Sequence, residues 1–137
     1  MHATGTIQVV LGEGEPGLLR MILEAQGFEV VGHARDDDEL LVILGVTRPT
    51  VVVLDAGISA LAAVEARERA HGAPIVVVWP RDAYTSLAEE RVDPGGVILE
   101  LGSAVRRAVE RHPVEEPIVI PEADPIPVAE PVAARLR

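Results

Sequence analysis

Short apolar runs rich in β-branched residues alternate along this chain with stretches whose apolar residues recur at helical spacing. The runs predict five strands, at residues 7–11, 28–32, 50–54, 74–79 and 97–99. The intervening patterns predict five helices, which begin near residues 18, 37, 60, 83 and 103. Strands that alternate with helices in this way form a parallel sheet covered on both faces, so we expect an α/β fold.

Capping signals at the predicted helix ends agree with this division. Asp36, Asp37 and Asp38 precede an apolar helical pattern, where carboxylates are favoured by the positive end of the helix dipole. Ser59 is a plausible N-cap for the alanine-rich helix through residue 71, and Gly27 is well placed to end the first helix. These residues fix the expected borders of three helices.

Length and composition limit the classes of function. A chain of 137 residues with 48% apolar content corresponds to about one folded domain. There is no cysteine, and the four histidines lack ligand spacing, so a structural metal is not expected. The net charge of −10 argues against nucleic-acid binding. No apolar run is long enough to span a membrane and no signal peptide is recognisable, which makes the cytoplasm the expected location.

The composition changes after His112. Six of the eleven prolines lie between residues 113 and 137, interleaved with acidic residues. We therefore expect a folded domain over residues 1–112 and a disordered, proline- and acid-rich tail over 113–137. An alternative is that Ile118–Ile120 or Ile126–Val128 docks against the sheet edge of a partner.

The loop from Gly12 to Gly17 matches the pattern G-x-G-x-x-G between a predicted strand and a predicted helix. This context is typical of a dinucleotide-binding loop, in which backbone N–H groups hold a pyrophosphate. Glu13 and Glu15 would place two carboxylates beside that pyrophosphate, and no substrate domain follows. Both points argue against a dinucleotide site, and a small-ligand or dinucleotide-binding α/β domain is kept only as an alternative.

The segments IQVVLGEGEP, GFEVVGHA, RPTVVVLD, PIVVVW and GVILE resemble, in order and spacing, the five strands of the receiver domain of two-component response regulators. The resemblance covers about residues 6–111. It implies a flavodoxin-like fold and a signalling function without enzymatic activity. It also implies that Asp55, at the end of the third run, is the phosphoacceptor candidate.

Other site positions depart from the pattern that the resemblance implies. Of the paired acids that hold Mg²⁺, the first corresponds to Glu13 and the second to Gly14, which leaves Glu13 and Asp55 as candidate ligands. The Ser or Thr after the fourth strand, which contacts the phosphoryl group, corresponds to Trp79. The lysine after the fifth strand corresponds to Glu100, and all twelve basic residues of this chain are arginines.

These departures predict a degenerate receiver, or pseudo-receiver, that acts by protein–protein interaction and is phosphorylation-independent or weakly phosphorylatable. The alternatives are a phosphoacceptor receiver that uses Asp55 with Mg²⁺, and a ligand sensor in which Trp79 lines an apolar pocket. The expected partners are a histidine kinase or a separate output protein, and residues 83–111 are the expected homodimer face. No DNA-binding pattern follows, so output would come from another chain.

Overall fold

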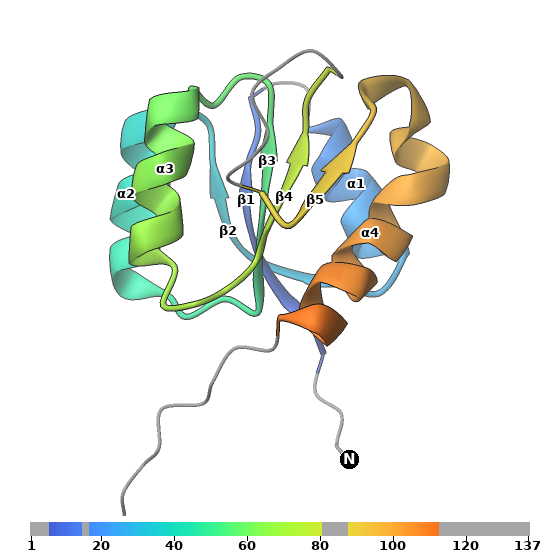
Figure 1. Ribbon diagram of the computed structural model, residues 1–137, viewed down its shortest axis with the longest axis horizontal. Helices are drawn as coiled ribbons and strands as arrows, with labels where there is room; N and C mark the ends of the chain where they lie inside the picture. The colour runs from blue at the N-terminus through green and yellow to red at the C-terminus, as the bar shows by residue number, and fades with distance from the viewer. Residues whose placement is uncertain (1–5, 15–16, 81–87, 113–137) are drawn as a thin grey trace, which may run out of the picture.

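The computed structural model describes residues 6–14, 17–80 and 88–112. Its centre is a five-stranded parallel sheet with the order β2-β1-β3-β4-β5 (Figure 1). The strands are β1 (Gln8–Gly12), β2 (Glu29–Ala34), β3 (Val51–Asp55), β4 (Ile75–Val78) and β5 (Glu90–Val92). The helices are α1 (Leu18–Ala25), α2 (Asp37–Val46), α3 (Ala60–Arg69) and α4 (Val97–Arg111), with a 3₁₀ turn η1 (Pro94–Gly96). This order is the flavodoxin-like one, so the predicted fold class is confirmed.

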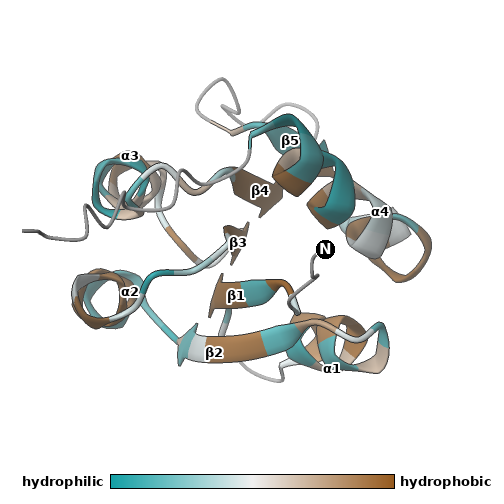
Figure 2. Cartoon of the chain, turned by 90° about the horizontal axis from the view of Figure 1, so that it is seen from below, coloured by the Kyte–Doolittle hydropathy of each residue, from teal (hydrophilic) through white to brown (hydrophobic). Residues whose placement is uncertain are grey.

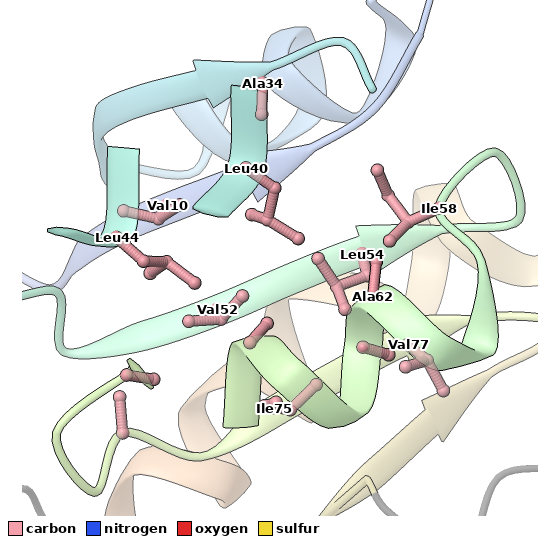
Figure 3. Close-up of a cluster of buried hydrophobic side chains, with 14 of the residues drawn as sticks. Val10, Ala34, Leu40, Leu44, Val52, Leu54, Ile58, Ala62, Ile75 and Val77 are labelled. Atoms are coloured by element: carbon pink, nitrogen blue, oxygen red, sulfur yellow. The ribbon is translucent and has the colours of Figure 1, made fainter. Parts of the chain in front are cut away.

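The sheet separates two apolar cores. Helices α2 and α3 cover one face, and α1 and α4 cover the other (Figures 1 and 2). Alternate residues of β3 serve the two cores, because successive side chains of a strand point to opposite faces. Val52 and Leu54 pack beneath α2 and α3 (Figure 3), whereas Val51 and Val53 pack beneath α1 and α4.

The three predicted capping residues are confirmed, although the alanine-rich helix ends at Arg69 and not at residue 71. The carboxylate of Asp36 accepts a hydrogen bond from the N–H of Glu39 at 2.9 Å, and Ser59 Oγ accepts one from Ala62 at 3.0 Å. Gly27 follows α1 with a φ of 93°, a conformation that glycine adopts without steric cost. The local signals at these three positions therefore act as the sequence indicates.

The prediction of the fifth strand was wrong. Residues 97–99 form the first turn of α4, and the strand is the polar segment Glu90–Val92. Val97 and Leu101 are buried at helical spacing, whereas Ile98 and Leu99 are 68% and 86% exposed, so the apolar run does not reflect a buried strand. The last helix accordingly begins at Val97 and not at residue 103.

Ion pairs explain how a polar segment occupies the edge of the sheet. The carboxylate of Glu90 accepts hydrogen bonds from Arg107 at 2.9 Å and Arg111 at 3.1 Å, both in the last turns of α4. Glu90 ends the predicted helix 83–90 but lies in β5, and residues 81–87 are outside the described part of the chain. The predicted tail, residues 113–137, also lies outside it.

Within the described ranges, no helix combines the length and the apolar character that crossing a membrane would require.

Candidate functional site at the carboxyl edge of the sheet

The helices that follow β1 and β3 cover opposite faces of the sheet, and this creates a crevice at the carboxyl ends of these two strands. A pocket of about 270 Å³ lies here. Glu13, directly after β1, and Asp55, the last residue of β3, both line it. The structure thus brings together the two residues that the sequence singles out as candidate metal ligands.

Glu13 is only 4% exposed, and its carboxylate is bound to the start of α1. One oxygen accepts the N–H of Leu19 at 2.7 Å, and the other accepts the N–H of Arg20 at 3.2 Å. Gly17, the N-cap residue, has no side chain to do this. Glu13 therefore caps α1 from outside the helix, where a negative charge also favours the helix dipole.

This cap bears on the dinucleotide alternative. A phosphate at the start of α1 would need the free N–H groups of its first turn. Two of these groups already donate to the carboxylate of Glu13, and a phosphate in their place would lie against a buried negative charge. Two N–H groups that a phosphate would need at the start of α1 are therefore occupied by Glu13, which argues against a dinucleotide site here.

Asp55 is tied to its surroundings through both its side chain and its backbone. Its Oδ1 accepts the N–H of Gly57 at 2.7 Å, which forms a local turn after β3. Its carbonyl oxygen accepts the indole N–H of Trp79 at 2.8 Å. The side chain is half-buried, so the second carboxylate oxygen, Oδ2, is the group available to a ligand in the pocket.

Trp79 lies on the opposite side of the sheet from this pocket. It is 4% exposed and belongs to the core beneath α2 and α3, and it is not among the residues that line the pocket. Its carbonyl oxygen accepts a hydrogen bond from Arg91 of β5 at 2.8 Å. The alternative in which Trp79 lines an apolar pocket is therefore wrong for the pocket beside Asp55, because the indole ring packs into the core.

The residue that follows β5 is Asp93, and Glu100 lies one turn into α4 on an exposed surface. The prediction that Glu100 follows the fifth strand was wrong, because residues 97–99 begin α4 and do not form a strand. The carboxylate of Asp93 accepts the N–H of Gly95 at 3.1 Å and caps η1. An acid, and not a cation, therefore stands at this point of the sheet edge.

The described residues do not fit a Mg²⁺ ion well. A site for this ion needs several oxygen ligands in a nearly octahedral arrangement. Both oxygens of Glu13 accept backbone N–H groups, and Gly14 offers no side chain. Throughout residues 6–14, 17–80 and 88–112, no three His, Cys, Asp or Glu side chains are grouped closely enough to hold a metal. Glu15 lies outside these ranges.

Comparison with known proteins supports the fold. No protein-family model matches the sequence, and no curated protein matches it either. Among solved structures, a LuxR-family two-component response regulator from an Aurantimonas species matches with a TM-score of 0.66 and 21% identity, over 79% of this chain and 88% of that one. The chain has the receiver-domain fold.

Two further receiver structures agree with this assignment. The response regulator TrrA from Thermotoga maritima, in complex with Mg²⁺–BeF, matches with a TM-score of 0.63 and 21% identity, over 75% of this chain and 99% of that one. A CheY-like receiver domain protein from Methanospirillum hungatei matches with a TM-score of 0.60 and 12% identity, over 78% and 99%. At these sequence identities the similarity shows the receiver fold alone. The roles of the site residues follow from their contacts in this chain.

Sequence reasoning missed two contacts that organise this site. The capping of α1 by Glu13 crosses six residues of the chain, which is beyond the local spacing of a capping box. The Trp79–Asp55 hydrogen bond joins the ends of two neighbouring strands. The general need of a buried tryptophan for a hydrogen-bond partner was the one indication of this bond in the sequence.

Proposed function

We propose that this receiver-type domain is a signalling module of the two-component kind that acts through protein–protein contacts and not through phosphorylation of Asp55. The observation that carries the proposal is the 2.8 Å hydrogen bond from the indole of Trp79, whose ring is buried in the core, to the backbone carbonyl of Asp55. The fold supplies the signalling context, and this contact argues for a site without a phosphorylation switch.

The argument concerns the hydrogen-bond donor at the end of β4. The resemblance to receivers implies a Ser or Thr at position 79, whose hydroxyl can turn toward a phosphoryl group. Trp79 has a single N–H donor, and it is already bound to the backbone of Asp55. Turning the ring into the pocket would break that bond and empty its place in the core, at a cost of several kcal/mol.

Electrostatics at the sheet edge points the same way. An aspartyl phosphate would add negative charge to a pocket that Glu13 already lines, and the residue that follows β5 at this edge of the sheet, Asp93, is also acidic. The resemblance implies a lysine where Asp93 follows β5, and the chain contains no lysine at all. Among the described residues, no cation lines the pocket and no group of Mg²⁺ ligands is found, so the phosphorylated state would lack from them the charge compensation that phosphoryl transfer requires.

The test is a titration with Mg²⁺ and beryllofluoride, which mimics an acyl phosphate, monitored by fluorescence of the single tryptophan. Trp79 contacts the backbone of Asp55, so any reorganisation there should change its emission. The proposal predicts no saturable change, with the fold intact by circular dichroism. A saturable change in the wild type that is absent in Asp55→Asn would overturn it.

One observation favours a second candidate, a weak phosphoacceptor. Asp55 keeps one carboxylate oxygen without a hydrogen bond among the described contacts, and it faces a pocket large enough for a phosphoryl group. In that case Mg²⁺ alone should already alter the Trp79 emission, with dependence on Asp55 and Glu13. The same titration therefore separates the two candidates.

The partner surface that we propose is the exposed start of α4, within the predicted face 83–111. Ile98 and Leu99 are large apolar side chains that are 68% and 86% exposed. Surface side chains of this size are common singly, but two adjacent ones favour a protein contact. We expect a separate output protein to bind here, and Leu99→Glu should weaken that binding without unfolding the domain.

A further inference from the structure

A second apolar surface lies on the other side of the molecule, across α2 and α3. It consists of Val42, Val46, Leu61 and Val64, whose side chains are 68%, 80%, 80% and 42% exposed. We call these four residues the α2–α3 stripe. The two helices lie side by side on one face of the sheet and pack against each other (Figure 1). The stripe therefore spans two neighbouring helices.

Helix α2 is apolar on both its inner and its outer side. Leu40 and Leu44 face the core and are fully buried, whereas Val42 and Val46 face outward. Figure 2 draws α2 largely in the colour of hydrophobic residues, in contrast to the mixed α3. A helix that covers a sheet normally has a polar outer face, and one that is apolar all round is normally buried on all sides. The outer face of α2 thus resembles a surface that is covered in the assembled protein.

Opposite charges stand at the two ends of this outer face. Asp38 lies four residues before Val42 and eight before Val46, on the same side of α2, and Arg48 follows the helix. Both are exposed, and neither has an ion-pair partner among the contacts of the described residues. By contrast, Asp37 on the neighbouring position is engaged with Ser59. From Asp38 through Val42 and Val46 to Arg48, two residues past the end of α2, the order is therefore acid, apolar, apolar, base.

We propose that the α2–α3 stripe is the interface of a homodimer in which α2 packs antiparallel to α2 of a second copy. A two-fold axis between Val42 and Val46 would place Asp38 of each copy near Arg48 of the other and bring the valines together. In an antiparallel pair, the acidic end of one copy thus meets the basic end of the other. An isologous interface requires such a self-complementary surface. A partner surface that carries only one sign of charge would face a like charge at one end of this surface.

This interface is distinct from the predicted dimer face at residues 83–111. The part of that face formed by α4 lies on the other side of the sheet and stays free for an output protein in the proposed arrangement. The stripe is small, so the dimer should be weak and should form at micromolar concentrations.

The test is sedimentation velocity of the full chain over about 5–200 µM, the range in which such an interface associates. The wild type should show a concentration-dependent shift from monomer to dimer. Val42→Glu should raise the dimer Kd by about tenfold or more, because a charge would be buried at the two-fold axis. Leu99→Glu is the matched control, since it places the same charge at an exposed apolar position on the opposite face and should leave the dimer unchanged.

Charge reversal adds a readout that misfolding cannot imitate. Asp38→Arg and Arg48→Asp should each weaken the dimer, and the double variant should restore it, because the exchanged charges pair again across the two-fold axis. A monomer throughout the concentration range would overturn the proposal. So would a dimer that survives Val42→Glu but dissociates with Leu99→Glu, which would place the interface on α4.

Discussion

The indole N–H of Trp79 donates a 2.8 Å hydrogen bond to the backbone carbonyl of Asp55, joining the ends of β4 and β3. The ring is buried beneath α2 and α3, away from the pocket that Asp55 lines. The residue that the resemblance identifies with a phosphoryl sensor is thereby part of the core. The hydrogen bond therefore connects a residue of the core, Trp79, to the residue that lines the pocket, Asp55.

Trp79→Phe should lower the free energy of unfolding by about 2–3 kcal/mol, since it removes a partly buried hydrogen bond and part of a buried, packed ring. Urea denaturation monitored by circular dichroism measures this loss. Leu99→Ala, at a position that is 86% exposed, should cost less than about 0.5 kcal/mol and serves as the control. Equal stability of Trp79→Phe and the wild type would contradict the structural role of the contact.

Glu13 should contribute to stability as the cap of α1. Glu13→Ala leaves the N–H groups of Leu19 and Arg20 without their acceptor in a buried place and should cost about 2 kcal/mol. Glu13→Gln keeps one acceptor oxygen and should cost about half as much. Glu24→Gln, which breaks an exposed ion pair with Arg20 within α1, should be nearly neutral. A Mg²⁺-dependent stability of the wild type would argue instead for a ligand role of Glu13.

The first glycine of the G-x-G-x-x-G pattern should be required for packing. A Cβ at Gly12 would lie 2.9 Å from side-chain atoms of both Ile58 and Leu54, whereas one at Gly14 would have no neighbour within 4 Å. Gly12→Ala should therefore cost about 1–3 kcal/mol, and Gly14→Ala should be tolerated. Thermal denaturation of the two variants tests this. A loss of stability at Gly14 with none at Gly12 would mean that the pattern serves a purpose other than packing.

The ion pair between Glu89 and Arg67 should make stability depend on pH. Burial acts to raise the pKa of Glu89, but hydrogen bonds from Arg67 and from the N–H of Ile75 outweigh it and hold the pKa below its usual value of 4.5. A carboxyl with a lowered pKa in the folded state stabilises the fold above its ordinary pKa, and this contribution is lost as the pH falls through the lowered value.

Urea denaturation at several pH values tests this sign with Glu89→Gln as the comparison. The wild type should be more stable than Glu89→Gln at about pH 7, and the difference should shrink as the pH falls below about 4.5. A difference that grows on acidification would contradict the structure. Glu65→Gln, which breaks an exposed pair with Arg69, should show little pH effect.

The order of strands and helices could be predicted because apolar periodicity and helix caps are local signals. Asp36, Ser59 and Gly27 each act within a few residues of their own position. The fifth strand could not be predicted in this way. Glu90 and Arg91 are polar, and they lie at the edge of the sheet through ion pairs and a hydrogen bond with α4 and Trp79, which are distant in the sequence.

The candidate site was predicted in part for the same reason. The positions of Asp55 and Glu13 at strand ends follow from the strand pattern, since parallel strands end at one edge of the sheet. The direction of the Glu13 carboxylate and of the Trp79 ring depends on which N–H and C=O groups lie near them in the folded chain. The displacement of the acid after the last strand from Glu100 to Asp93 follows from the displaced strand.

The most direct test of the central claim is phosphoryl incorporation at Asp55. The full chain is incubated with Mg²⁺ and a small acyl phosphate donor such as acetyl phosphate, and its intact mass is measured over time beside that of Asp55→Asn. A module that signals by protein contact alone should gain no phosphoryl group that depends on Asp55. Incorporation of one phosphoryl group that requires Mg²⁺ and is absent in Asp55→Asn would contradict the account and make this chain a working phosphoacceptor.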